Sequence, residues 1–140
     1  MLYLDTSALL KLHIREAGSE TVQEKITSQD HPLPIWEIQE MELVNALRLK
    51  TYWKDITIEQ AEHQIELFQD RRKRRLYYFP EIDRIALMKR FHQLSKETTR
   101  LGCRTMDILH IACALEIGAT QFITFDQRQK ALAKESGLNL

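Results

Sequence analysis

The feature that most limits the possible fold is a short apolar segment that stops at an acidic residue. Residues 2–4 are Leu-Tyr-Leu, which has the length of a buried strand. Asp5, Thr6 and Ser7 follow and are helix-capping residue types, and the apolar residues from 8 to 14 have helical spacing. We therefore expect Asp5 at the carboxyl end of a strand, where open α/β sheets bind ligands. A simple cap for the first helix explains Asp5 equally well.

The same pattern returns near the other end of the chain. Residues 121–125 read as a strand, and Asp126 follows directly and opens the last helix. Strands and helices alternate in between: strands are expected at 33–36 and 76–79, and helices at 20–27, 37–53, 57–75, 83–102 and 105–118. This alternation predicts one α/β domain over residues 1–140, with a mainly parallel central sheet flanked by helices.

The charge balance limits how the chain could bind nucleic acid. Twenty basic and twenty acidic residues give a net charge of zero, so RNA binding would need a local patch. The obvious candidate is a run of five cations at the end of a predicted helix: Arg71, Arg72, Lys73, Arg74 and Arg75. The run could contact phosphates, or it could be a solvated helix end whose charge suits the helix dipole.

Several features favour a cytoplasmic protein without a membrane segment. No window approaches the ~18 unbroken apolar residues of a membrane span, and Asp5 interrupts the N-terminus before a signal-peptide core could form. Cys103 and Cys113 form no metal-ligand pattern, and we expect both to be buried, reduced thiols.

Three further acidic residues, on two predicted helices, are comparable with Asp5 and Asp126. Asp107 opens a helix that is apolar nearly all round, where an ionised carboxylate is costly unless it is paired, hydrogen-bonded or bound to a metal. Its place in the first turn also suits the helix dipole. The helix after the second strand carries Glu40 and Glu42, and periodicity does not distinguish them. His110, one turn after Asp107, is expected to be a hydrogen-bonded core residue.

If the sheet is parallel, these acids converge on one of its edges. Two carboxylates ~6 Å apart repel by about 3 kcal/mol at an effective dielectric constant of about 20, so such a cluster favours a bound cation. All-oxygen ligands select hard cations such as Mg²⁺ or Mn²⁺, which activate water for attack on a phosphodiester. Each acid nevertheless has a capping explanation of its own.

Four segments in this order carry a family resemblance: LDTSALLK, ELVNAL, DILHIACAL and FITFDQRQKALAKESGL. Together they resemble the PIN-domain ribonucleases, and within that group they are most similar to the toxins of VapBC toxin–antitoxin pairs. The resemblance implies that four acids are catalytic and bind the metal, namely Asp5, Glu42, Asp107 and Asp126. It prefers Glu42 to Glu40 because Leu43 and Ala46 match the family pattern. It also assigns supporting roles to Thr6, Ser7 and Thr124.

The resemblance implies an Mg²⁺- or Mn²⁺-dependent endoribonuclease that acts on RNA as a homodimer and is blocked by a partner antitoxin. One departure concerns the Ser or Thr that often precedes the second acid, because residues 35–41 contain neither. A non-catalytic RNA- or protein-binding member of the same fold is the main alternative, and the presence of all four acids argues against it. A phosphoacceptor domain would need a second acid beside the first or a second Asp two residues after it. Here Leu4 precedes Asp5, and Ser7 stands where the second Asp would be.

Overall fold

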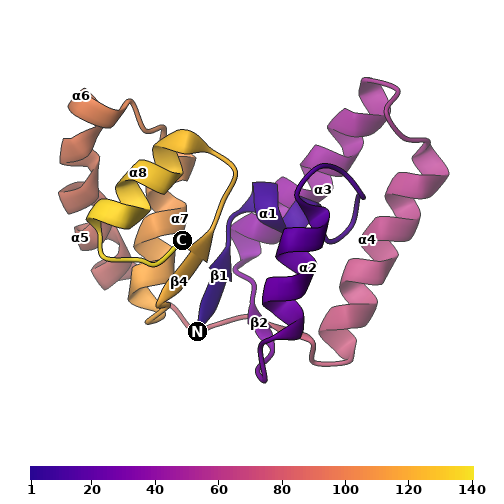
Figure 1. Ribbon diagram of the computed structural model, residues 1–140, viewed down its shortest axis with the longest axis horizontal. Helices are drawn as coiled ribbons and strands as arrows, with labels where there is room; N and C mark the ends of the chain where they lie inside the picture. Colours follow the sequence, from indigo (N-terminus) through magenta and orange to yellow (C-terminus); the bar gives the residue numbers. More distant parts are fainter. The chain divides into compact units, whose positions relative to one another are not determined.

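The computed structural model describes all residues from 1 to 140, and their contacts group into two compact units (Figure 1). The first unit joins Met1–Ala8 to Pro80–Leu140, and the second is Leu9–Phe79. Helix α1 (Thr6–Leu10) carries the chain from the first unit into the second.

A pair of parallel strands forms the centre of the first unit. Strand β1 (Leu2–Leu4) pairs with β4 (Gln121–Ile123), and Tyr3 lies opposite Phe122. The two rings stack at 5.5 Å between centroids, and both side chains are fully buried. The first and last predicted strands are therefore neighbours and run in the same direction. As a result, Asp5 and Asp126 follow the same ends of two adjacent strands.

Helices complete the first unit: α5 (Arg84–Leu94), a 3₁₀ turn (Ser95–Glu97), α6 (Thr98–Leu101), α7 (Thr105–Glu116) and α8 (Gln127–Glu135). Helix α7 packs against α5 and α8. Most of its residues are buried, as its apolar composition predicts. Gly102 ends α6 with a φ of 66°, a conformation that glycine adopts without strain.

The second unit consists of α2 (Ser19–Thr27), β2 (Leu33–Pro34), α3 (Glu37–Tyr52), α4 (Ile58–Lys73) and β3 (Tyr77–Tyr78). Strands β2 and β3 pair in parallel. Thr57 caps α4: its hydroxyl accepts the Gln60 N–H at 3.2 Å, and the Gln60 side chain accepts the Thr57 N–H at 2.8 Å.

A buried histidine lies in the core of the second unit. The His13 ring is 6.0 Å from the Phe68 ring, and its Nδ1 is 3.2 Å from Oε1 of Gln64. Burial, together with the nearby Arg71 guanidinium, lowers the pKa of His13 from 6.5 to about 4. His13 is therefore a neutral core residue at pH 7.

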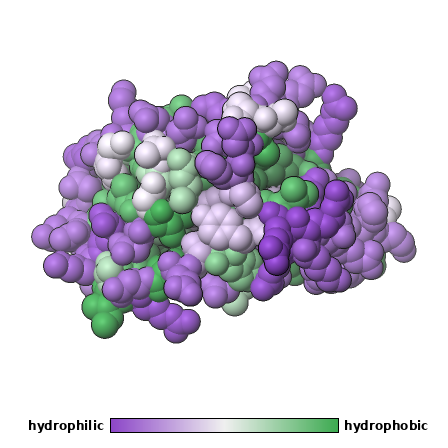
Figure 2. All heavy atoms as spheres, turned by 90° about the horizontal axis from the view of Figure 1, so that it is seen from below, coloured by the Kyte–Doolittle hydropathy of each residue, from purple (hydrophilic) through white to green (hydrophobic).

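The observed elements confirm the predicted α/β class and the parallel strand pairing, although the strands are shorter than predicted. The segment 138–140 contributes only a bridge between Asn139 and Gln121. No helix is both long and apolar enough to cross a membrane. Figure 2 shows hydrophobic surface among the hydrophilic side chains on one face, and exposed apolar residues include Tyr52, Trp53 and Ile58 around the α3–α4 connection.

Candidate active site

Asp5 is held at the end of β1 by neutral hydrogen-bond donors. Its carboxylate accepts the Ser7 hydroxyl at 2.7 Å, the Ala8 N–H at 2.8 Å and the Thr124 hydroxyl at 2.7 Å. Burial raises the pKa of Asp5, and the bonds from Thr124, Ala8 and Ser7 offset that rise only in part. Asp5 thus caps α1 and also presents a carboxylate that a nearby positive charge would stabilise.

Short hydrogen bonds tie the loop after β4 to Asp5. The Thr124 hydroxyl, which donates to Asp5, accepts the Asp126 N–H at 3.0 Å. The Ser7 hydroxyl accepts the Phe125 N–H at 3.1 Å. Two residues predicted to support the site, Ser7 and Thr124, therefore orient Asp5 directly and link it to the strand that leads into Asp126.

Thr6, the third predicted supporting residue, faces a different partner. Its hydroxyl is 3.5 Å from Nε2 of His110, and Nδ1 of His110 is 3.0 Å from the Tyr3 hydroxyl. His110 is a buried, hydrogen-bonded residue of α7, as the sequence predicts. Thr6 and His110 therefore anchor the start of α1 to α7.

Asp126 caps α8. Its carboxylate accepts the N–H groups of Arg128 at 2.8 Å and Gln129 at 3.2 Å. Partial burial acts to raise the pKa of Asp126, but these bonds and the Arg128 guanidinium outweigh burial and lower it. The side chain is 22% exposed, so its carboxylate is ionised at neutral pH and accessible from solvent.

Asp107 is almost fully buried in the first turn of α7. Its carboxylate accepts the Arg104 N–H at 2.8 Å and Nε2 of Gln129 at 3.2 Å. Arg104 is the N-cap residue, directly before Thr105, the first residue of the helix. Asp107 therefore has a capping role, whether or not it also binds a ligand.

Two arginines join Asp107 to Asp126. The Arg104 guanidinium is 3.3 Å from Asp107 and 3.6 Å from Asp126, and the Arg128 guanidinium is 3.8 Å from Asp107 and 3.4 Å from Asp126. Hydrogen bonds and ion pairs thus form an unbroken chain from Asp5 through Asp126 to Asp107. The structure brings these three acids of the first unit into one connected network.

Sequence reasoning missed Arg104, Arg128 and Gln129. Their spacing could have indicated contacts with the acids. Arg104 lies one helical turn before Asp107, and Arg128 and Gln129 occupy the first turn of the helix that Asp126 caps. The predicted repulsion between carboxylates therefore overlooked two cations supplied by the chain itself.

The donor set of this network fits a hard cation. It offers carboxylate and hydroxyl oxygens, which Mg²⁺ and Mn²⁺ prefer, and no thiolate. Oε1 of Gln129 is buried without a hydrogen-bond partner, although its amide nitrogen bonds Asp107. No group of three or more His, Cys, Asp or Glu side chains is gathered closely enough to hold a metal in this conformation. Arginine contacts occupy the carboxylates of Asp107 and Asp126 instead.

The predicted second acid, Glu42, is a half-buried residue of α3 in the second unit. Glu40 pairs with Arg72 of α4 at 3.6 Å. That ion pair gives Glu40 a structural partner within its own unit. The assignment of Glu42 as a site residue stays a prediction.

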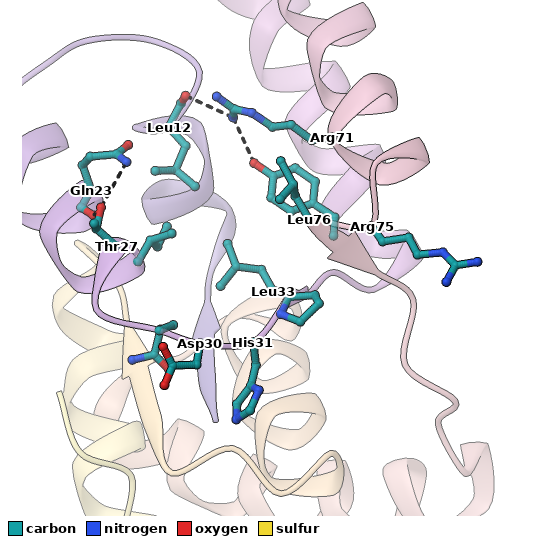
Figure 3. Close-up of a pocket in the computed structure, with 13 residues that line it drawn as sticks. Leu12, Gln23, Thr27, Asp30, His31, Leu33, Arg71, Arg75 and Leu76 are labelled. Carbon is teal, nitrogen blue, oxygen red and sulfur yellow. Dashed lines mark hydrogen bonds between the residues drawn. The ribbon is translucent and has the colours of Figure 1, made fainter.

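The cations at the end of α4 differ in their surroundings. Arg71 donates to the Leu12 carbonyl at 3.4 Å and to the Tyr77 hydroxyl at 3.0 Å (Figure 3). Arg72 lies over the Phe79 ring at 3.8 Å, and Arg74 pairs with Asp70 at 3.6 Å. Arg71 is thus held by the fold, whereas the Arg74–Asp70 pair lies on the surface, with both side chains more than half exposed. Four members are exposed, namely Arg72, Lys73, Arg74 and Arg75, and Figure 3 shows Arg75 extending away from its neighbours.

A pocket of about 510 Å³ lies within the second unit (Figure 3). Its lining includes Leu12, Ile26 and Leu33, with Arg71 and His31 among its polar members. None of the four predicted catalytic acids lines it.

Comparison with known proteins identifies the family of the chain. The family model for the PIN domain matches residues 2–135, and the chain therefore belongs to the PIN domain family. It is also similar to Ribonuclease VapC46 of Mycobacterium tuberculosis (strain ATCC 25618 / H37Rv), with 24% identity over 139 residues. That alignment covers 98% of this chain and 93% of the relative.

Proposed function

We propose that this protein is a metal-dependent endoribonuclease of the VapC toxin type. The observation that carries the proposal is the connected network of Asp5, Asp107 and Asp126 at the ends of β1 and β4 and at the start of α7. Membership of the PIN domain family and similarity to a VapC ribonuclease point to the same activity.

Each residue has a defined part in this proposal. Asp5, Asp107 and Asp126 would hold Mg²⁺ or Mn²⁺ through carboxylate oxygens, and Glu42 is proposed as the fourth ligand from the family pattern. Ser7 and Thr124 fix the rotamer of Asp5 by donating to its carboxylate. When bound, a divalent cation would supply an activated water and would stabilise charge on the phosphodiester.

The proposed partners are RNA as substrate, a second copy of the chain and a cognate antitoxin. A ribonuclease of this type would act in the cytoplasm, and the two buried free thiols are compatible with that compartment. Protein partners would bury apolar surface, and Tyr52 and Trp53 are 79% and 60% exposed. An antitoxin encoded next to this chain should bind it and block RNA cleavage.

The test is cleavage of labelled RNA by purified protein with Mg²⁺, with Mn²⁺ and with excess EDTA. We expect cleavage only with a divalent cation, and a loss of orders of magnitude in Asp126→Asn. Asp83→Asn is the matched control, because Asp83 also caps a helix of the first unit by accepting two N–H groups. Asn can keep the capping bonds in both variants, so only a role of Asp126 beyond capping separates them.

Two results would contradict the proposal: undiminished cleavage in EDTA, or equal activity of the Asp126→Asn and Asp83→Asn proteins. RNA binding without cleavage under every metal condition would favour the alternative of a non-catalytic binding protein. Glu42→Gln compared with Glu40→Gln tests the second acid, and loss of activity is expected only for Glu42→Gln.

A further inference from the structure

Two arginines occupy the carboxylate oxygens that the proposed cation would need. Arg104 donates from Nε to Oδ2 of Asp107 at 3.3 Å and from Nη2 to Oδ1 at 3.4 Å. Arg128 donates from Nη2 to Oδ2 of Asp126 at 3.4 Å. Each guanidinium also lies within 4 Å of the other aspartate, at 3.6 Å and 3.8 Å. The two positive charges balance the two negative ones.

The two sides of these ion pairs differ in how firmly they are held. The Asp107 side chain is 1% exposed and is fixed by the Arg104 N–H and the Gln129 amide. The guanidinium-bearing side chains are open to water, at 66% exposed for Arg104 and 42% for Arg128. The arginine side chains can therefore swing into solvent while the carboxylates stay in place.

A guanidinium and a divalent cation cannot share the same carboxylate oxygens. Mg²⁺ binds such oxygens at 2.0–2.1 Å, and a guanidinium hydrogen-bonded to them would bring like charges into close contact. Loading of the site therefore requires the arginines to move.

We propose that Arg104 and Arg128 are built-in counter-ions that hold Asp107 and Asp126 in the metal-free protein and that a divalent cation displaces. This inference rests on the proposed function, because it needs the cation to bind these carboxylates. The arginines keep the acids ordered without metal, and competition from their charge raises the cation concentration at which the site loads. Both are positioning residues that act through the two aspartates.

The first test measures Mn²⁺ affinity by the loss of the free-ion EPR signal. Arg104→Gln/Arg128→Gln should bind Mn²⁺ about tenfold more tightly than wild type, since it lacks two weak, solvent-exposed ion-pairing groups that compete with the cation. Arg100→Gln is the matched control, because Arg100 is an exposed arginine of the same unit that pairs with Glu97 and Glu135. Its Mn²⁺ affinity should equal that of wild type.

The second test follows displacement in wild type through the Nε–Hε NMR signals of arginine during Mg²⁺ titration. Signals of Arg104 and Arg128 should move toward the positions of unpaired arginine, while the Arg100 signal stays constant. Unmoved Arg104 and Arg128 signals at Mg²⁺ saturation, or equal or weaker Mn²⁺ binding by the folded double variant, would overturn the inference alone. Absence of any Mn²⁺ binding by wild type would overturn the proposed function as well.

Discussion

Replacing Asp107 by Asn tests how the buried carboxylate is stabilised. Without metal, Asp107 accepts the Arg104 N–H and the Gln129 amide and contacts two guanidinium groups. Asn keeps one acceptor oxygen but turns an amide toward these donors. The loss of charge-assisted bonds in a buried site costs about 1.5–3 kcal/mol, and the exposed guanidinium contacts add at most about 1 kcal/mol.

Relief of carboxylate repulsion acts in the opposite direction. Sequence reasoning that considers only clustered acids predicts that Asn stabilises the metal-free protein. The structure places Arg104 and Arg128 against both Asp107 and Asp126, so most of that repulsion is already neutralised. We therefore expect Asp107→Asn to be less stable than wild type by about 2–3 kcal/mol in EDTA.

Magnesium should then widen the difference. A ligand at 100 times its dissociation constant stabilises the native state by about 2.7 kcal/mol, and the variant has lost one of the proposed ligands. The assay is urea unfolding of both proteins at pH 7, in EDTA and in Mg²⁺. Higher stability of Asp107→Asn in EDTA would refute the ion-pair argument. An Mg²⁺ effect that is equal or absent in both proteins would refute the role of Asp107 as a ligand.

Three further predictions concern residues outside that ion-pair network or at its edge. Neutral His13 has a folded pKa of about 4 against 6.5 unfolded, so the free energy of unfolding should fall by about 3 kcal/mol as the pH drops through that interval. Urea unfolding at several pH values should show that the free energy of unfolding depends less on pH in His13→Leu than in wild type, and an equal pH dependence in both proteins would contradict this. Thr124→Val should lower stability by about 1–3 kcal/mol by removing the donor to buried Asp5, and a neutral effect in urea unfolding would contradict the geometry. If Lys73 and Arg75 contact RNA, Gln at each should reduce the salt slope of RNA binding by about 0.7 per lost phosphate contact, and an unchanged slope would identify a solvated helix end.

The class of fold and the position of three acids could be predicted because both depend on local patterns. Two segments in which a strand is followed by an aspartate and then a helix predicted that Asp5 and Asp126 lie at the same edge of the sheet. The apolar composition of the helix that carries Asp107 predicted its burial. The arginine contacts could not be predicted in the same way. Arg104 and Arg128 reach Asp107 and Asp126 only because α7 and α8 pack together, which periodicity does not specify.

The surroundings of each cation in the basic run 71–75 likewise could not be predicted from the local sequence pattern. Five consecutive cations look equivalent in sequence, yet Arg71 is committed to a carbonyl and a tyrosine, and Arg72 to an aromatic ring. Tertiary packing of α4 against β3 decides which of them remain available. The prediction that the run contacts RNA stays a prediction, and Lys73 and Arg75, both exposed, are the members chosen to test it.

The central proposal is that Asp5, Asp107 and Asp126 bind a divalent cation, with Glu42 as a fourth ligand proposed from the family pattern, and iron-directed cleavage of the polypeptide tests it most directly. Fe²⁺ in place of Mg²⁺, with ascorbate and peroxide, cuts the chain close to the bound ion. The account predicts cuts near all four acids that excess Mg²⁺ suppresses and that Asp107→Asn abolishes. Scattered cuts, or cuts that persist in Asp107→Asn and in excess Mg²⁺, would contradict it.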